Sequence, residues 1–198
     1  MIRTARDEDA AAIHAIYAPS VSGGTATFET ELPDTDAMRE RIHTRLQLYP
    51  WLVWEESGDV LAYAYAGRFR ERAAYDWIAE TSIYVHADVH RQGIARQLYE
   101  VLLNVMRLQG IHQAVGVISL PGTASVALHE TMGFRAAGVW RQCGYKLGQW
   151  WDVGVWQKTL LPAASPPRPP TPYSTLIGTP ALLQLLSQTP AASPDLEK

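Results

Sequence analysis

Cysteine is nearly absent from this chain, with Cys143 the only one among 198 residues. A single thiol cannot build an internal disulfide framework, nor a metal site that uses several cysteines. The sequence also lacks any apolar run near the ~20 residues that span a bilayer, and its first residues lack the pattern of a signal peptide. We therefore expect a cytoplasmic protein with no membrane partner.

An excess of charge of one sign is missing as well. The 17 Lys and Arg residues against 20 Asp and Glu residues give a formal net charge of −3, and the isoelectric point is about 6.1. Binding to nucleic acid needs a basic face that neutralises phosphates, so we expect no nucleic-acid partner. Hydrophobic residues make up 47% and charged residues 19%, which is typical of one globular domain, or one domain with an appendage.

Proline is unevenly distributed along the chain. Four of the 13 prolines stand at positions 19, 33, 50 and 121, and the other nine fall within residues 162–198. The run Ser-Pro-Pro-Arg-Pro-Pro-Thr-Pro at 165–172 cannot donate the backbone hydrogen bonds of a helix or sheet, so it predicts an irregular segment. Residues 181–187 are largely apolar and could form a short helix, which persists only if it docks on something.

This change in composition predicts a folded domain over residues 1–161 and a Pro-rich, largely irregular C-terminal extension over residues 162–198. The extension lacks a core of its own. We interpret it as dispensable, and the alternative is a ligand for a proline-binding partner.

Hydrophobic periodicity predicts a mixed α/β domain whose largest sheet stretch is antiparallel. The predicted strands cover residues 2–5, 51–55, 60–66, 77–86, 114–118, 137–145 and 150–158. The predicted helices cover residues 7–17, 34–49, 93–109 and 123–132, with a loop over residues 19–33. Along the chain the order is β-α-α-β-β-β-α-β-α-β-β.

A polar connector at residues 87–90 joins the third long strand to a helix that begins at Gly93. A helix start has unpaired backbone N–H groups and a partial positive charge, so it suits a phosphate group. Gly93 lets the backbone approach a ligand closely, and the small side chain of Ala95 avoids crowding. A tight strand-to-helix turn without a ligand explains the same residues, so this segment alone leaves both interpretations open.

Together with the later Met132-Gly133-Phe134, the segment resembles the GNAT superfamily of N-acetyltransferases. Their acetyl-CoA-binding motif is Gln/Arg-x-x-Gly-x-Gly/Ala; His90 occupies its first position here, and Gly122 stands where the family usually has Asn. The resemblance implies an α/β GNAT fold, with a mixed, mostly antiparallel central sheet flanked by helices and with splayed central strands. It also implies acetyl-CoA as the cosubstrate. The cofactor-binding residues that it implies are Ile83, Tyr84, Val85, Arg91, Gln92, Gly93, Ile94, Ala95 and Arg96.

A narrower resemblance covers residues 2–161, where many separate blocks in the same order are similar to the phosphinothricin N-acetyltransferase family. Those blocks are residues 49–53, 64–67, 74–77, 79–81, 84–85 and 144–154. That family acetylates the α-amino group of glutamate-like amino acids, namely phosphinothricin and, in relatives, methionine sulfoximine and methionine sulfone. The resemblance therefore implies a small-molecule amino-acid substrate and a homodimer.

Two other functions stay open at this point. A GNAT enzyme could acetylate another amine, such as a protein N-terminus or a polyamine, although Arg70 and Arg72 disfavour a polyamine pocket. A non-catalytic sensor would bind acyl-CoA without turnover, whereas the presence of Glu80 and His129 favours an enzyme.

Glu80 is the candidate general base. An α-ammonium group must lose a proton before it attacks a thioester, and a partly buried carboxylate can accept that proton. Alternation along the otherwise uncharged strand places residues 80, 82 and 84 on one face and residues 81, 83 and 85 on the other. A solvent-facing carboxylate fits the same pattern, and it is the resemblance that assigns the role of base to Glu80.

His129 is the second catalytic candidate. It lies in the predicted helix 123–132, where many GNAT enzymes place a Tyr that protonates the departing thiolate. An imidazole, with its unperturbed pKa of ~6.5, suits that acid role or a share in the base role, and a structural helix histidine is the alternative. Cys143 has no base spaced to activate it, so we expect direct transfer without an acyl-enzyme, and no His, Asp and Glu cluster predicts a metal site.

The resemblance also assigns the remaining contacts. A backbone N–H near Val85, where the strand splays from its neighbour, would stabilise the developing oxyanion, and residues 83–85 would pair with the pantetheine amides. The acceptor-binding residues that it implies are Phe28, Arg70, Arg72, Tyr75 and Tyr99. Arg72 is the preferred anion anchor because a guanidinium pairs bidentately with such groups, and a solvated loop is the alternative for Arg70 and Arg72.

Overall fold

The computed structural model describes residues 1–90 and 92–187. The strands are β1 (Ile2–Thr4), β2 (Trp51–Glu56), β3 (Asp59–Arg68), β4 (Ile78–Val85), β5 (Gln113–Ser119), β6 (Arg135–Lys146) and β7 (Gln149–Thr159). The α-helices are α1 (Ala10–Ser22), α2 (Thr35–Leu46), α3 (Ile94–Gln109), α4 (Thr123–Thr131), α5 (Tyr173–Leu176) and α6 (Pro180–Ser187). Short 3-10 turns are η1 (Asp7–Asp9), η2 (Ala73–Tyr75) and η3 (Ala87–Val89). None of the helices in these described ranges is long and apolar enough to cross a membrane.

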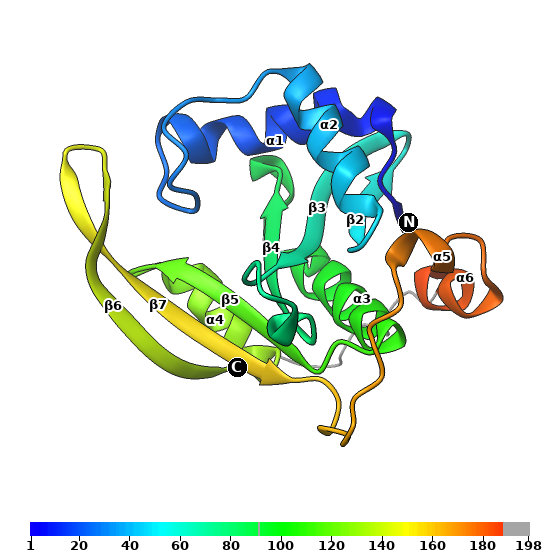
Figure 1. Ribbon diagram of the computed structural model, residues 1–198. Helices are drawn as coiled ribbons and strands as arrows, with labels where there is room; N and C mark the ends of the chain where they lie inside the picture. Colours follow the sequence, from blue (N-terminus) through cyan, green and yellow to red (C-terminus); the bar gives the residue numbers. More distant parts are fainter. Residues whose placement is uncertain (91, 188–198) are drawn as a thin grey trace, which may run out of the picture.

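The strands form one seven-stranded sheet in the order β1-β2-β3-β4-β5-β7-β6 (Figure 1). Neighbouring strands are antiparallel except β4 and β5, which run parallel. Up to residue 161, strands and α-helices follow one another in the predicted order. The predicted class, a mixed and mostly antiparallel sheet flanked by helices, is therefore confirmed.

Two hydrophobic clusters hold the helices on the two faces of the sheet. On one face, the apolar stripe of α3 is buried, and Leu98, Leu102 and Val105 are completely inaccessible to solvent. On the other face, Ile13 of α1 and Ile42 of α2 pack against β2 and β3. Because apolar residues recur at helical spacing, each helix turns one side to the sheet and leaves the other to solvent.

The first helix is longer than predicted. We expected it to end near residue 17 because Pro19 lacks the N–H that a helix interior needs. The structure continues α1 through Pro19 to Ser22, and the N–H of Gly23 closes the helix on the carbonyl of Pro19 at 3.1 Å. A proline in the last turns of a helix removes one backbone hydrogen bond. The burial of Val21 in the cluster between α1 and the sheet offsets that loss.

β4 and β5 separate part-way along their length. Their pairing covers three positions, which join Ile78, Ala79 and Glu80 to residues 113–115. Beyond that point β4 stays paired with β3 up to Val85, while β5 stays paired with β7 up to Ser119. A gap therefore opens in the middle of the sheet, and the predicted splaying of the central strands is confirmed.

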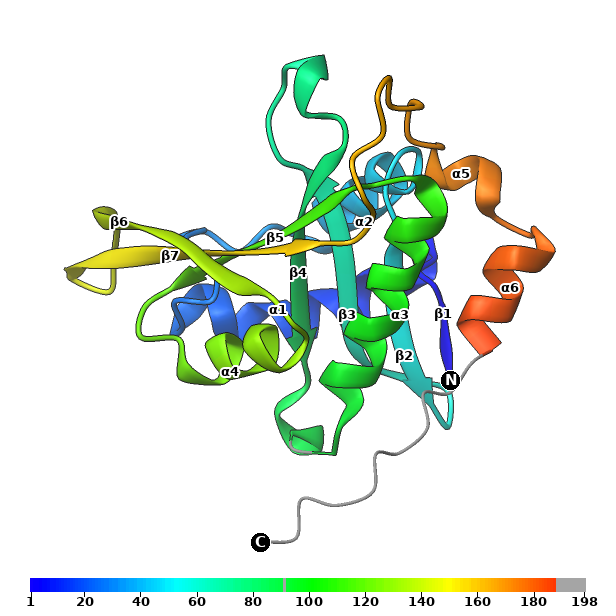
Figure 2. The ribbon, with the colours of Figure 1, turned by 90° about the horizontal axis from the view of Figure 1, so that it is seen from below.

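The C-terminal extension packs against the domain. Tyr173 and Leu182 are buried within the same hydrophobic cluster as α3, and the Tyr173 hydroxyl lies 2.6 Å from the Thr4 hydroxyl. Burial raises the pKa of Tyr173 to about 12. α5 and α6 run beside β1 and α3 (Figure 2). The expected short helix is present as α6, and the burial of Tyr173 and Leu182 leads us to predict that the extension stabilises the domain rather than being dispensable.

Candidate active site

The gap between β4 and β5 contains a cavity of about 490 Å³. It is lined by residues 81–84 of β4, residues 117–119 of β5, residues 123–125 at the start of α4 and His129 in its last turn. A second cavity of about 330 Å³ contains Glu80 and shares parts of β4 and β5 as walls. The two predicted catalytic residues therefore border adjoining spaces.

Glu80 and His129 approach the gap from opposite faces of the sheet. The Thr81 hydroxyl lies 2.5 Å from the Tyr99 hydroxyl of α3, which fixes the face to which Thr81 points. Since neighbouring side chains of a strand alternate, Glu80 points to the other face, which α1 and α2 cover. His129 is hydrogen-bonded to the same Tyr99, so it lies on the α3 face.

The backbone of β4 turns free amides toward the gap. The N–H of His86 donates to the Leu61 carbonyl of β3 at 2.8 Å. In an antiparallel pair such bonded positions alternate, so the N–H groups of Ile83 and Val85 point away from β3 and toward the gap. The ring Nε2 of His90 donates to the Val85 carbonyl at 3.1 Å. Two of the predicted cofactor-binding residues thus offer unpaired donors along one edge.

Glu80 occupies the last position at which β4 pairs with β5. It lies opposite Gly67 of β3 and Val115 of β5. Burial raises the pKa of its carboxyl, and the charges of Arg70 and Arg45 oppose that rise. A carboxylate whose pKa moves toward neutrality is a more effective proton acceptor at neutral pH.

His129 sits directly over β5. A Cβ built on Gly116 would lie 2.3 Å from the His129 Nε2, so only glycine leaves room for the ring. Nδ1 donates to the Ser125 carbonyl at 2.8 Å, which assigns the proton of the neutral ring to Nδ1. Burial lowers the pKa of His129, which favours this neutral form. Nε2 then accepts a hydrogen bond from the Tyr99 hydroxyl at 2.9 Å.

Tyr99, predicted to bind the acceptor, lies in the core on the α3 face of the sheet. Its side chain is completely buried between Thr81 and His129, and it lines neither of the two cavities. The Thr81 oxygen lies 2.5 Å from the Tyr99 oxygen and 3.0 Å from the Val115 carbonyl. While Tyr99 donates to neutral His129, the single Thr81 proton is donated to Tyr99. Tyr99 therefore holds the imidazole of His129 in place and does not line the cavity beside Glu80.

At the start of α3, Gly93 adopts a backbone conformation that favours glycine. Gly93 caps the helix with φ +78°, a left-handed conformation that residues with a Cβ rarely adopt. The nearest atom to a Cβ at this position is Gln97 Nε2 at 3.6 Å, an ordinary van der Waals contact with a side chain, so no other described atom crowds this point. Of its neighbours, Gln92 and Arg96 are exposed, Ile94 is buried and Ala95 is half-buried. Arg91 lies outside the described residues.

The predicted acceptor residues divide into two groups. Phe28 lines the Glu80 cavity, and its ring fills the space above Gly144, where a Cβ would lie 2.2 Å from it. Arg70, Arg72 and Tyr75 lie on the exposed loop between β3 and β4 and line neither cavity. Arg70 packs over the Phe69 ring at 4.3 Å, and its charge reaches Glu80.

Lys146 was not predicted from the sequence, yet it holds one wall of the Glu80 cavity. Its ammonium is buried and donates to the carbonyls of Ser20 at 2.8 Å and Thr27 at 2.9 Å. These bonds tie the β6–β7 hairpin to the loop that carries Phe28. A lysine in a long, mostly polar hairpin gives no sequence signal for this role, because its partners are backbone atoms 119 and 126 residues away.

The chain matches the family model of the acetyltransferase (GNAT) domain over residues 2–155. It is 41% identical over 176 residues to the phosphinothricin N-acetyltransferase of Streptomyces viridochromogenes, covering 88% of this chain and 95% of that protein. It is 35% identical over 168 residues to the L-methionine sulfoximine/L-methionine sulfone acetyltransferase of Pseudomonas aeruginosa, covering 84% and 98%. The crystal structure of a GNAT superfamily phosphinothricin acetyltransferase from Sinorhizobium meliloti, in complex with AcCoA, matches with a TM-score of 0.80 and 33% identity, covering 87% and 97%.

These matches run over the same residues that build the gap, the glycine-started helix and the two candidate catalytic side chains. The family match extends from β1 into β7, and each relative is covered almost from end to end. The chain therefore belongs to the GNAT family and is an N-acetyltransferase.

Proposed function

We propose that this protein transfers the acetyl group of acetyl-CoA to the α-amino group of a glutamate-like amino acid, such as phosphinothricin, methionine sulfoximine or methionine sulfone. The names of the relatives support this acceptor class. The observation that carries the proposal is the position of Glu80, whose half-buried carboxylate borders the gap at the point where β4 leaves β5.

The cosubstrate would supply an activated acetyl thioester. The unpaired N–H of Ile83 would bind one of its amides, and the unpaired N–H of Val85 would hold the thioester oxygen. The backbone at Gly93 and the first turn of α3 would hold the pyrophosphate, with Arg91, Gln92 and Arg96 as further contacts. Fit is supported by the left-handed Gly93 at the start of α3 and by the cavity along the free edge of β4.

Glu80 would remove the proton from the acceptor's ammonium group. The free amine then attacks the thioester carbonyl directly. As the carbon–sulfur bond breaks, the attacking nitrogen gives up its extra proton, and the departing thiolate takes it up to become the thiol of coenzyme A. Cys143 is exposed at the wall of the Glu80 cavity. None of its neighbours in the described chain hydrogen-bonds to it as a base would, so we assign it no acyl-enzyme role.

His129 would share the handling of the proton. In its neutral form Nε2 accepts from Tyr99, so the ring has room for one more proton. Once Nε2 is protonated, it can donate to the Tyr99 hydroxyl. Tyr99 then donates to the Thr81 hydroxyl, and Thr81 donates to the Val115 carbonyl. Every donor in this row of hydrogen bonds is then paired. This arrangement favours a proton-accepting role beside Glu80 over that of a resting acid.

One acidic group of the acceptor would meet Arg70 and Arg72, with Phe28 and Tyr75 as further contacts. Arg70 is the better supported of the two, because its charge already acts on Glu80. We also propose a homodimer that works in the cytoplasm. The projecting β6–β7 hairpin (Figure 1) carries exposed aromatic side chains that suit such contact, and light scattering on the purified protein tests it.

The experiment that tests this function is a thiol-release assay. Purified protein is incubated with acetyl-CoA and with phosphinothricin, methionine sulfoximine, methionine sulfone or an ordinary amino acid, and with spermidine or a peptide bearing a free N-terminus. We expect turnover with the glutamate-like acceptors and little with the rest. Preference for the peptide or the polyamine would contradict the acceptor class, and acetyl-CoA binding without turnover of any amine would indicate a sensor.

A further inference from the structure

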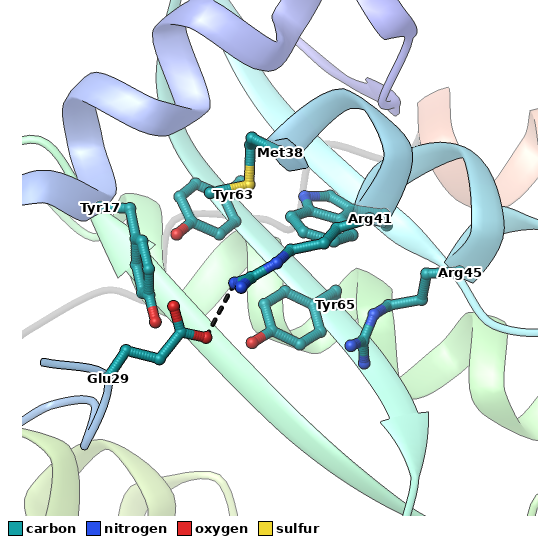
Figure 3. Close-up of a pocket in the computed structure, with 8 residues that line it drawn as sticks. Tyr17, Glu29, Met38, Arg41, Arg45, Tyr63 and Tyr65 are labelled. Atoms are coloured by element: carbon teal, nitrogen blue, oxygen red, sulfur yellow. Dashed lines mark hydrogen bonds and ion pairs between the residues drawn. The ribbon is translucent and has the colours of Figure 1, made fainter. Parts of the chain in front are cut away.

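A third cavity, of about 180 Å³, lies under α2 beside the Glu80 cavity (Figure 3). The two cavities share Tyr17, Glu29 and Tyr65 as walls. A ligand whose amine faces Glu80 would therefore have its far end at the wall of this third cavity. Neither the proposed function nor the resemblance assigns a role to the two cations that line it, Arg41 and Arg45.

The floor of this cavity is aromatic. Trp51, Tyr63 and Tyr65 stack on one another along β2 and β3, with ring centroids 4.5 to 6.3 Å apart. Such a floor suits the methylene groups of a short side chain. It also excludes water on one side, which strengthens the attraction of a charge placed above it.

The two arginines above the floor differ in their pairing. Arg41 Nη1 donates to Glu29 Oε1 at 2.8 Å, so its charge is balanced (Figure 3). The Arg45 guanidinium lies over the ring of Tyr65, 4.5 Å from its centroid. Within the described residues, the only hydrogen bond of this side chain is a long one of 3.4 Å to the Ala66 carbonyl. Among these residues, no carboxylate forms an ion pair with Arg45.

Arg45 is also close to the reacting centre. A Cβ built on Gly67 would lie 1.9 Å from Arg45 Nη1, so the guanidinium fills the space above Gly67. Gly67 is the cross-strand partner of Glu80, and side chains of such partners lie on the same face with Cβ atoms about 5 Å apart. The guanidinium thus occupies the place next to Glu80 that a side chain at position 67 would otherwise take.

We propose that Arg45 binds the acidic group at the far end of the acceptor's side chain and thereby selects acceptors that carry a negative charge there. This inference rests on the proposed function, in that it takes an amino acid as acceptor. A half-buried, unpaired guanidinium above an aromatic floor pairs well with a carboxylate or a phosphinate and gains little from a neutral sulfone. The α-carboxylate is common to all these acceptors and does not distinguish them.

The test compares two acceptors of similar length in the same enzyme sample. Phosphinothricin carries an anionic far end, and methionine sulfone a neutral one. We expect Arg45→Gln to lower the ratio of kcat/KM for phosphinothricin to that for methionine sulfone about 10- to 100-fold, mainly through the KM of phosphinothricin. Because both values come from one sample, the ratio does not depend on how much of the variant is folded.

Two further variants complete the experiment. Arg39 lies on the same helix but pairs with the exposed Asp36, so Arg39→Gln should leave the ratio unchanged. Arg45→Lys keeps the charge and should recover part of the lost ratio. An Arg45→Gln variant that acetylates both acceptors with an unchanged ratio overturns the assignment.

The same data separate two other roles. If Arg45→Gln slows both acceptors equally and shifts the acid side of both pH profiles, Arg45 acts on Glu80 and the proposed selection is wrong. Wild-type enzyme that acetylates neither acceptor contradicts the proposed function itself and, with it, this assignment.

Discussion

The two halves of β4 belong to one continuous strand but have different neighbours. From Ile78 to Glu80 the strand is hydrogen-bonded to β3 on one side and to β5 on the other. From Thr81 to Val85 it keeps β3 alone. The paired half belongs to the core, as the completely buried Ala79 illustrates, whereas the open half lines a cavity. The lesson is that the site arises where pairing stops, because free backbone amides there can bind a ligand.

Glu80 stands at the border between the halves, and its replacement should have the largest effect. Glu80→Gln keeps the size of the side chain but removes its ability to accept a proton. We expect kcat at pH 7 to fall by roughly 10²–10⁴, with the KM for acetyl-CoA nearly unchanged. Steady-state kinetics measure both values. A variant that keeps more than about a third of wild-type kcat would transfer the role to His129 or to solvent.

The hydrophobic cluster around α3 can be weakened at Tyr173 without changing the open half of β4. Tyr173→Ala removes a completely buried ring from the α3 cluster and should lower the free energy of unfolding by about 3–5 kcal/mol. Tyr173→Phe loses only the hydrogen bond to Thr4, at about 1 kcal/mol. Urea denaturation measures the loss, and kcat of the folded fraction should not change. Equal stability of Tyr173→Ala and wild type would restore the view of the extension as dispensable.

The start of α3 tests the part of the site that is expected to bind acetyl-CoA. Gly93→Val forces a β-branched residue into a left-handed conformation where the pyrophosphate is expected, and the KM for acetyl-CoA should rise tenfold or more. Gly110 provides a matched control, because it ends the same helix with φ +87° and has open space around it. Gly110→Val should cost similar stability and leave the KM unchanged. If both variants raise the KM alike, the binding assignment at Gly93 fails.

The smallest effect is expected at Cys143. Its thiol borders the Glu80 cavity, yet direct transfer does not use it. Cys143→Ser should therefore change kcat less than about twofold. A loss comparable to that of Glu80→Gln, or a burst of thiol release in the absence of acceptor, would indicate an acyl-enzyme.

Local patterns predicted the elements of this fold, and strand alternation correctly placed Thr81 and Glu80 on opposite faces. The end of α1 was misplaced because tertiary burial of Val21 outweighed the local cost of Pro19. The docking of Tyr173 could not be predicted, because its partners lie far away in sequence.

The site was predicted unevenly for the same reason. The roles of Glu80, Gly93 and His129 came from the resemblance together with their local pattern. Arg45 was missed because its importance depends on an approach of α2 to Gly67 that no local pattern encodes. Tyr99 was assigned to the substrate cavity, whereas the structure buries it beside His129.

The most direct test of the central claim is the pH dependence of kcat/KM in wild type and in Glu80→Gln. Burial raises the pKa of Glu80, and the base works only when deprotonated. Wild-type activity should therefore fall as the pH drops through that raised pKa, above the usual range of a glutamate, and this acid limb should be absent from Glu80→Gln. His129→Phe should keep the limb. An acid limb that persists in Glu80→Gln and disappears in His129→Phe would contradict the assignment of Glu80 as the base.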